Sequence, residues 1–161
     1  MGCVAGIDRI GVIGAGQMGN GIAHVGAMAG YSITLTDISQ AALDKARATI
    51  EKNLGRQVKK ERITEEQAQA ALSRLVMSTD MASLHDSNLV IEAATENQAL
   101  KFKIFEQLSG VAHSDALFAS NTSSISIIRL APALDDGNRR QSPLVGYRRR
   151  RWRFFQNPQN L

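Results

Sequence analysis

A glycine-rich turn near the N-terminus constrains the fold of this 161-residue chain more than any other feature. Residues 10–13, IGVI, form a short apolar run that is typical of a strand buried on both faces. Gly14, Gly16 and Gly19 follow it in the spacing G-x-G-x-x-G, and apolar residues then recur at helical spacing up to Gly30. A strand, a glycine turn and a helix in this order predict the first unit of a doubly wound α/β fold.

Each glycine of this turn meets a separate structural requirement. Gly14 permits the tight turn out of the strand, Gly16 lets a pyrophosphate approach the backbone, and Gly19 lets the helix pack closely on the strand. The free N–H groups and the positive dipole end of the helix favour phosphate groups. We therefore predict a dinucleotide-binding loop formed by Gly14, Ala15, Gly16, Gln17, Met18 and Gly19.

The second predicted strand, residues 31–37, alternates polar and apolar residues and ends in Asp37, 18 residues after Gly19. An aspartate at this place accepts hydrogen bonds from both hydroxyls of an adenine ribose and repels a 2′-phosphate. This pattern predicts NAD rather than NADP as the cofactor. Asp37 could instead cap the helix that begins near Ser39, and the two roles are compatible.

Two helices are predicted between the second and third strands, where a minimal nucleotide-binding unit needs only one. Residues 39–60 present an apolar face that consists of Leu43, Ala46, Ile50 and Leu54. Residues 64–67, TEEQ, form a capping-box pattern that opens a further helix. The sequence therefore predicts a helical pair inserted into the α/β unit.

The remaining periodic segments complete a mainly parallel sheet. Apolar runs predict strands at residues 75–78, 88–92 and 116–119, and a helix that begins near residue 98 is expected to end at Gly110. The polar loop at residues 120–124 follows the last of these strands. Ligands of open α/β sheets bind at this carboxyl edge, so the loop is a candidate binding segment.

The net charge of +4 comes from the end of the chain. Residues 1–134 hold 12 Lys and Arg against 13 Asp and Glu, whereas residues 135–161 hold seven Arg against two Asp. We therefore divide the chain into an α/β domain at residues 1–134 and a basic tail at residues 135–161. Nothing in the first 134 residues indicates nucleic-acid recognition, so no nucleic-acid partner is predicted for the domain.

Cysteine usage and hydropathy exclude several classes of protein. Cys3 is the only cysteine, so neither an intrachain disulfide nor a cysteine metal cluster is predicted, and no metal site is expected. The sequence has neither a signal-peptide pattern nor an apolar run of membrane-spanning length. We therefore expect a cytoplasmic protein without a membrane partner.

Four segments, taken together and in order, resemble the NAD-binding domain of the 3-hydroxyacyl-CoA dehydrogenase family, in its bacterial short-chain 3-hydroxybutyryl-CoA form. They are residues 14–21, GAGQMGNG; residues 35–37, LTD; residues 90–97, VIEAATEN; and residues 120–124, SNTSS. The predicted helical pair is another mark of this family. The resemblance covers about three quarters of the chain and implies a Rossmann-type fold that binds NAD.

The resemblance implies roles for residues near the nicotinamide and the substrate. Glu96 and Lys101 would lie near the nicotinamide half of NAD, with Asn121 also on the cofactor side. Ser123 would contact both the cofactor and the substrate hydroxyl, which makes it the catalytic candidate. Without the resemblance, Glu96 is equally well explained as an acid in the first turn of a helix.

The resemblance also implies residues for the acyl-CoA substrate. Lys60 would approach the phosphates of coenzyme A. Asn53 is a weaker candidate, because the family often has a smaller hydroxyl residue at this position. Without the resemblance, Lys60 is equally well explained as one charge on a solvated helix face.

The implied activity is the NAD-linked interconversion of 3-hydroxyacyl-CoA and 3-oxoacyl-CoA in fatty-acid or butanoate metabolism. Past residue 130 the family continues into a G-x-H-F-x-N-P motif, whose histidine is the general base, and into a helical domain that forms the dimer. This chain has no histidine after His113 and no glutamate after Glu106, and Leu144 falls near the expected place of the base. We therefore expect NAD binding with impaired catalysis, and the resemblance predicts no oligomeric state for this chain.

Three interpretations of residues 135–161 are open. The abrupt change to a composition rich in Arg, Gln, Asn and Pro favours an out-of-frame or truncated end without ordered structure. A basic arm is the second interpretation, because four adjacent arginines at residues 148–151 lie beside Trp152 and could bind a phosphate backbone. A diverged but ordered last strand is the third.

Other classes of function also remain open for the whole chain. One is a non-catalytic NAD-binding module. Another is a different NAD-dependent dehydrogenase, such as the 3-hydroxyisobutyrate type, which shares the Gly-x-Gly-x-Met-Gly loop. That type is not expected to carry the helical pair or residues 121–124, so the sequence disfavours it.

Overall fold

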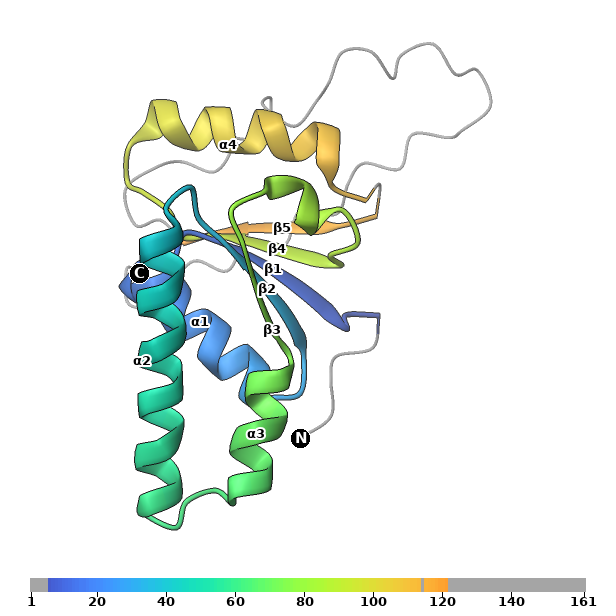
Figure 1. Ribbon diagram of the computed structural model, residues 1–161. Helices are drawn as coiled ribbons and strands as arrows, with labels where there is room; N and C mark the ends of the chain where they lie inside the picture. The colour runs from blue at the N-terminus through green and yellow to red at the C-terminus, as the bar shows by residue number, and fades with distance from the viewer. Residues whose placement is uncertain (1–5, 114, 122–161) are drawn as a thin grey trace, which may run out of the picture.

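The computed structural model describes residues 6–113 and 115–121, which form a five-stranded parallel sheet with helices on both faces (Figure 1). The strands are β1 (Arg9–Ile13), β2 (Ser32–Thr36), β3 (Leu75–Ser78), β4 (Leu89–Glu92) and β5 (Leu117–Ser120). The helices are α1 (Gln17–Met28), α2 (Gln40–Lys59), α3 (Glu65–Ser73) and α4 (Gln98–Val111), with a short 3-10 helix η1 (Met81–Leu84). This architecture confirms the predicted Rossmann-type fold.

The order of the strands is β3-β2-β1-β4-β5, so the chain starts in the middle of the sheet. It first builds one side with β2 and β3, and then crosses β1 to add β4 and β5 on the other side. All four strand pairs are parallel, and the register places Val12 opposite both Leu35 and Ile91. The strand order therefore reverses between β1 and β4, which is the switch point where open α/β sheets bind ligands.

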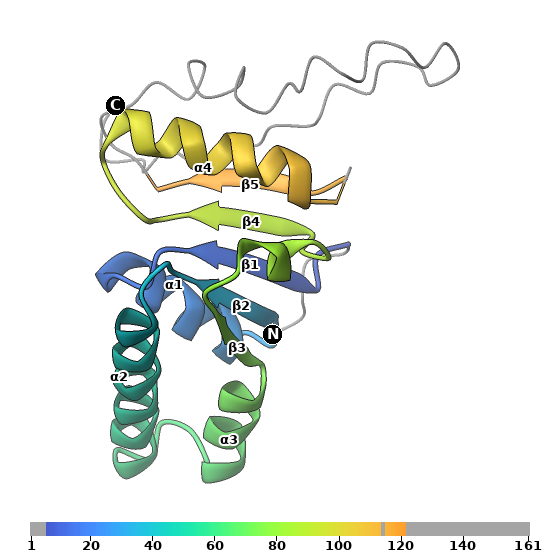
Figure 2. The ribbon, with the colours of Figure 1, turned by 45° about the horizontal axis from the view of Figure 1, so that its top comes forward.

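Alternation along the strands directs side chains into two separate cores. On one face, the cluster that contains Val12 and Leu35 packs against α1, α2 and α3. On the other face, the cluster that contains Ile13 and Phe118 packs against α4 and η1. Figure 2 shows α4 beside β4 and β5, away from the helical pair. The two cores hold the helices of the connections against the two faces of the sheet.

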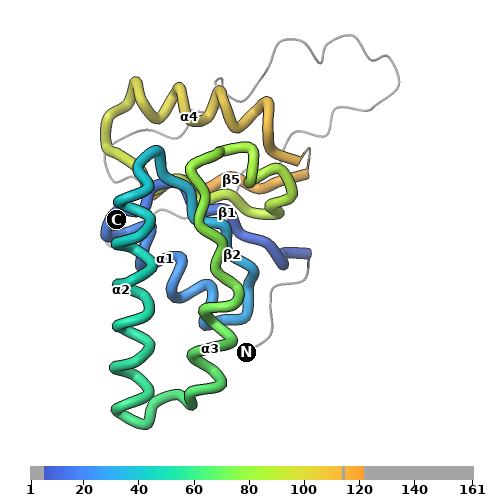
Figure 3. The backbone as a smooth tube through the Cα atoms, viewed as in Figure 1, coloured from blue at the N-terminus to red at the C-terminus, as the bar shows by residue number. Residues whose placement is uncertain are grey.

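The predicted helical pair is confirmed, together with its local signals. The side chain of Ser39 caps α2 by accepting a hydrogen bond from the N–H of Ala42. Thr64 and Gln67 form the reciprocal capping box at the start of α3. The four apolar residues predicted for the inner face of α2 are all buried. The pair extends beyond the sheet as a hairpin, which the tube in Figure 3 shows most simply.

One predicted boundary is wrong. We expected Gly110 to end the fourth helix, but α4 continues through this residue to Val111. The N–H of Ala112 still donates to the carbonyl of Leu108, and Gly110 does not adopt a positive φ. The glycine therefore stays inside the last helical turn. Gly30, by contrast, has a φ of 102° and follows Ala29, the C-cap residue of α1, where a left-handed glycine commonly ends a helix.

Within the residues that the structure describes, no helix has the combination of length and apolar composition needed to cross a membrane. The same residues contain no group of three or more His, Cys, Asp and Glu side chains arranged to hold a metal ion.

Candidate functional site

The carboxyl edge of the sheet brings together four of the predicted binding segments. The glycine turn follows β1, Asp37 follows β2, Glu96 lies in the connection from β4 to α4, and Asn121 follows β5. These segments are far apart in the sequence but emerge from the same edge because all their strands are parallel. Ser123, the predicted catalytic residue, and the whole of residues 135–161 lie outside the described residues.

The glycine turn is held in a conformation that side chains would prevent. Gly14 has a φ of 100°, and its N–H donates to the carbonyl of Thr36 at 2.7 Å. A Cβ on Gly14 would lie 2.5 Å from the Cα of Ala94 in the connection after β4. A Cβ on Gly19 would lie 1.7 Å from the carbonyl oxygen of Gly14. Both positions therefore require glycine for close backbone approach.

Gly16 differs from Gly14 and Gly19 because no described atom crowds the space where a side chain would lie. It is the N-cap residue of α1, and no side chain caps this helix within the described part of the chain. Among the described residues, a Cβ on Gly16 would meet no atom within 4 Å apart from its chain neighbours. The first turn of α1 thus presents N–H donors and the positive end of the helix dipole beside open space. This donor set fits the diphosphate of a dinucleotide.

Asp37 is tied directly to the glycine turn. One carboxylate oxygen accepts a hydrogen bond from the N–H of Ala15 at 2.8 Å, and the other accepts from the N–H of Ser39 at 2.9 Å. The cap of α2 itself is the side chain of Ser39, so Asp37 supports the entry of the helix without being its N-cap. The half-buried carboxylate therefore bridges the glycine turn and the start of α2.

A buried ionic network lies under the other half of the edge. The ammonium group of Lys101 contacts a carboxylate oxygen of Glu92 at 2.5 Å, and both side chains are 0% exposed. The hydroxyl of Ser120 donates to the same oxygen at 2.6 Å and lies 3.3 Å from the Nζ of Lys101. The ammonium group of Lys101, a residue predicted to lie near the nicotinamide, is thus bound by Glu92 at the end of β4 and by Ser120 at the end of β5.

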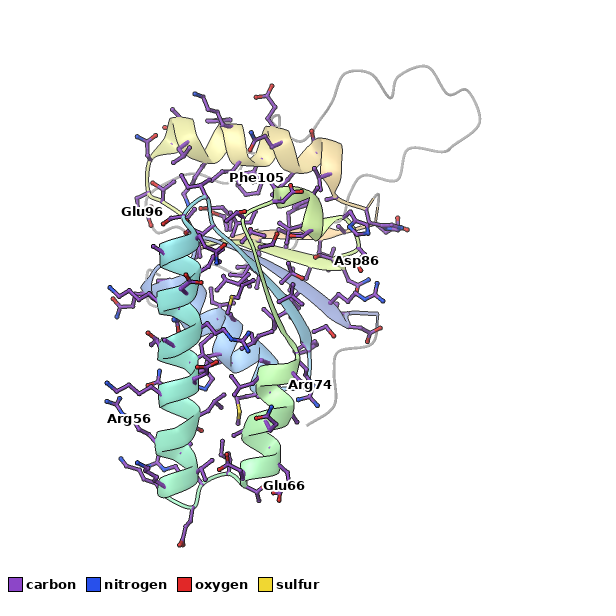
Figure 4. The ribbon with its side chains drawn as sticks, in the orientation of Figure 1. Arg56, Glu66, Arg74, Asp86, Glu96 and Phe105 are labelled. Atoms are coloured by element: carbon purple, nitrogen blue, oxygen red, sulfur yellow. The ribbon has the colours of Figure 1, made fainter. Side chains whose placement is uncertain are left out.

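The connection between β4 and α4 is fixed by the second oxygen of Glu92. This oxygen accepts hydrogen bonds from the N–H of Ala94 at 2.9 Å and from the N–H of Thr95 at 3.4 Å. Asn97 then caps α4 by accepting from the N–H of Leu100. Glu96 lies between these anchors, and Figure 4 shows it on the connection that leads into α4. Its side chain is exposed at the edge of the sheet.

The two predicted substrate residues lie on α2, away from the glycine turn. Asn53 is half-buried and Lys60 is the exposed C-cap residue of this helix. A helix of 20 residues is about 30 Å long, so Lys60 lies roughly that far from the start of α2 at the carboxyl edge. Figure 4 shows Arg56 toward this far end of α2 and Glu66 at the tip of the hairpin. The structure therefore separates Asn53 and Lys60 from the candidate nucleotide residues.

Gln17 and Met18 also line an apolar groove of about 530 Å³ beside α1. Ile22 and Val25 continue the groove along the helix, and Ile91 of β4 contributes to it. The lining is predominantly apolar, so the groove does not suit a charged diphosphate. The backbone N–H groups at the start of α1, rather than this groove, are the donors expected to bind phosphate.

Two titratable groups away from the edge have shifted pKa values. Burial between α1 and α2 lowers the pKa of His24, whose Nε2 lies 3.3 Å from the amide nitrogen of Gln57. The partly buried His24 is thus explained by packing between the two helices. The hydroxyl of Thr64 lowers the pKa of Glu66 in the first turn of α3. Neither group lies among the residues predicted to bind the nucleotide.

Sequence reasoning missed the roles of Glu92 and Ser120 in this arrangement. The sequence places Glu92 at the end of a predicted strand and Ser120 at the start of a polar loop, and neither position by itself indicates a contact between them. The register pairs these two residues across β4 and β5. The available signal was a charged residue at an inward-facing position of a buried strand, since such a residue needs a buried partner.

Comparisons with known proteins agree with this geometry. The family described as the 3-hydroxyacyl-CoA dehydrogenase NAD-binding domain matches residues 9–145. A 3-hydroxybutyryl-CoA dehydrogenase of Bradyrhizobium diazoefficiens is 53% identical over 129 residues, which are 80% of this chain and 44% of that protein. A 3-hydroxybutyryl-CoA dehydrogenase of Mycobacterium tuberculosis is 45% identical over 128 residues, 79% of this chain and 45% of that protein.

A solved structure is similar over the same part of the chain. The crystal structure of (S)-3-hydroxybutyryl-CoA dehydrogenase from Ralstonia eutropha superposes with a TM-score of 0.76 at 46% sequence identity. The match covers 79% of this chain and 45% of that structure. The chain thus spans less than half the length of these relatives. It belongs to the 3-hydroxyacyl-CoA dehydrogenase family, through the NAD-binding domain of that family.

Proposed function

We propose that this chain provides the NAD-binding half of a 3-hydroxybutyryl-CoA dehydrogenase and binds NAD across the carboxyl edge of its sheet. The observation that carries the proposal is the glycine turn, whose first helical N–H groups border open space beside Gly16 while Asp37 is anchored next to it. In this proposal the N-terminus of α1 binds the diphosphate and Asp37 binds the adenine ribose.

The nicotinamide half of the cofactor would extend toward β4 and β5. Glu96, Lys101, Asn121 and Ser123 are the residues proposed for this side, and Asn121 is exposed at the end of β5. NAD supplies a carbon that accepts hydride from the hydroxyl-bearing carbon of a 3-hydroxyacyl-CoA. The contribution of Ser123 would be to orient the substrate hydroxyl. Lys60 and Asn53 are proposed to contact the phosphates of coenzyme A from α2.

Removal of the hydroxyl proton needs a general base, and this chain offers no histidine after His113. Loss of a general base lowers the rate by about 10² to 10⁴-fold. We therefore propose that the chain by itself binds NAD and turns over 3-hydroxyacyl-CoA poorly. The names of the relatives support a short acyl chain such as 3-hydroxybutyryl-CoA as the substrate class.

Calorimetry with NADH and NADPH, combined with an assay of NADH oxidation by acetoacetyl-CoA, tests this proposal. We expect saturable NADH binding, NADPH binding at least about tenfold weaker, and a turnover at least about 100-fold below that of a full-length relative. Absence of NADH binding would overturn the proposed function. Turnover equal to that of a full-length relative would overturn only the proposed catalytic impairment.

Leu144, which stands near the expected place of the base, favours a second candidate, a non-catalytic NAD-binding module. The two candidates differ when the chain is mixed with the separately produced C-terminal domain of a full-length relative. Recovery of acetoacetyl-CoA-dependent NADH oxidation in the mixture supports the dehydrogenase half-site. NADH binding without any recovered turnover supports the non-catalytic module.

A further inference from the structure

Glu92 is the centre of the buried network, and the proposed reaction does not use it. Its two carboxylate oxygens accept four hydrogen bonds, from the ammonium of Lys101, the hydroxyl of Ser120, and the backbone N–H groups of Ala94 and Thr95. The side chain is fully buried. Each donor belongs to a part of the molecule other than β4 itself.

These contacts join every described segment that is proposed to lie on the nicotinamide side. Ala94 and Thr95 lead to Glu96, and Lys101 lies one turn inside α4. Ser120 ends β5 directly before Asn121, and the N–H of Asn121 donates to the backbone carbonyl of Glu92 at 2.7 Å. Movement of the Glu92 carboxylate would therefore change the relative positions of the connection, the helix and the end of β5.

The connection that Glu92 anchors passes close to the glycine turn. A Cβ added to Gly14 would lie 2.5 Å from the Cα of Ala94 and 2.8 Å from the carbonyl carbon of Ala93. A buried ion pair is seldom required for stability, since apolar residues of similar volume often replace it without loss. Four directional bonds to three elements, in contrast, define a geometry that apolar packing does not define.

We propose that Glu92 is a positioning residue that sets the geometry of the nicotinamide side of the cofactor site. It acts through Lys101, Ser120 and the connection from β4 to α4, and it does not contact the cofactor itself. The inference rests on the proposed function, namely NAD binding at the carboxyl edge. It predicts that loss of the carboxylate impairs recognition of the nicotinamide half more than recognition of the adenine half.

The test compares NADH with ADP as ligands of the full chain. ADP contains the adenosine and the two phosphates, which are the groups proposed to contact Asp37 and α1. In Glu92→Gln, the side-chain amide directs N–H donors toward either the backbone N–H groups or the Lys101 ammonium, so one side of the network is lost. We expect calorimetry to show NADH affinity about tenfold weaker and ADP affinity changed less than about twofold.

Glu106→Gln is the matched control, because it makes the same chemical change at an exposed position of α4, the helix that carries Lys101. This variant is expected to bind both ligands as the unmodified chain does. Equal weakening of NADH and ADP in Glu92→Gln, or no weakening of NADH, would overturn the inference while the proposed function stands. Failure of the unmodified chain to bind either ligand would instead overturn the proposed function and this inference with it.

Ser120→Ala keeps the inference testable if Glu92→Gln does not fold. It removes one donor to the Glu92 carboxylate and leaves the ion pair with Lys101 in place. We expect NADH affinity to fall about threefold, with ADP affinity unchanged. The emission maximum of bound NADH reports the surroundings of the nicotinamide ring, and it should shift in this variant. An unchanged spectrum together with unchanged affinities would contradict the positioning role.

Discussion

The two halves of the carboxyl edge use opposite means to define a binding surface. The half beside β1 and β2 is made mainly of backbone, with the Asp37 carboxylate as its anchor. Gly14 and Gly19 admit close approach, and no described side chain caps the start of α1. The half at the ends of β4 and β5 is held in place by buried charged and polar side chains, and Glu92 and Lys101 are fully buried. The first half depends on the absence of side chains, whereas the second depends on their exact partners.

This difference has consequences for how each half tolerates change. The glycine turn is disrupted by steric overlap, because a Cβ added at Gly14 or Gly19 would displace the neighbouring backbone. A buried ion pair is disrupted electrostatically. Removal of one member leaves the charge of the other uncompensated in a medium of low polarity, which destabilises the fold. Substitutions of matched size in the two halves should therefore separate the two kinds of failure.

The largest expected effect is on the ionic half. Lys101→Met leaves the Glu92 carboxylate buried without its counter-ion, and the free energy of unfolding should fall by about 3–5 kcal/mol. Chemical denaturation followed by circular dichroism measures this change. The double variant Lys101→Met with Glu92→Gln should recover part of the loss, because no uncompensated charge remains.

The exposed pair of Arg47 and Glu51 on α2 provides the control for this experiment. Arg47→Met removes a cation of similar length from an i,i+4 pair in contact with solvent. The expected change is below about 0.5 kcal/mol. A stability loss in Lys101→Met as small as that in Arg47→Met would show that burial of the ionic half has no energetic consequence.

The next largest effect is expected in the backbone half. Gly19→Ala would bring a Cβ to 1.7 Å from the carbonyl oxygen of Gly14, so the turn and α1 must separate. We expect a loss of about 1–3 kcal/mol in unfolding free energy and a loss of NADH binding by calorimetry. Gly21→Ala, in the same helix with open space around it, should be neutral or stabilising. Retained NADH affinity in Gly19→Ala would show that the cradle does not need this contact.

The smallest effect is expected at the link between the glycine turn and β2. Both oxygens of Asp37 accept backbone N–H bonds, so the amide of Asp37→Asn must direct its own N–H toward one of these donors. Unfolding free energy should fall by about 1 kcal/mol. NADH and ADP should both bind more weakly, in contrast to Glu92→Gln. The exposed Asp44→Asn is the matched control, and selective loss of NADH alone would contradict this assignment.

The backbone half could be predicted from the sequence because its reasons are local. The spacing of three glycines, a preceding apolar strand and an acid at the end of the next strand all fall within residues 10–37. The helical pair was predictable for the same reason, since Thr64 and Gln67 form their capping box within one turn. Comparisons with known proteins then confirmed the family that the longer set of motifs had indicated.

The ionic half could not be predicted because it depends on tertiary register. Glu92 and Ser120 are 28 positions apart and meet only because β4 and β5 pair in one particular alignment. Lys101 reaches them from α4, so its burial follows from the way that helix packs. The wrong boundary at Gly110 has a local origin instead. The N–H of Ala112 donates to the carbonyl of Leu108, so the last helical turn forms despite the weak helix preference of glycine.

The anchoring of the glycine turn by β2 affects the thermodynamics of ligand binding. Two successive N–H groups of the turn, those of Gly14 and Ala15, are bound by Thr36 and Asp37. A loop that orders only around its ligand loses conformational entropy at that moment, and affinity falls accordingly. In this domain β2 has already imposed that order during folding. The conformational entropy of the glycine turn is therefore lost during folding. The turn loses little further entropy when a nucleotide binds.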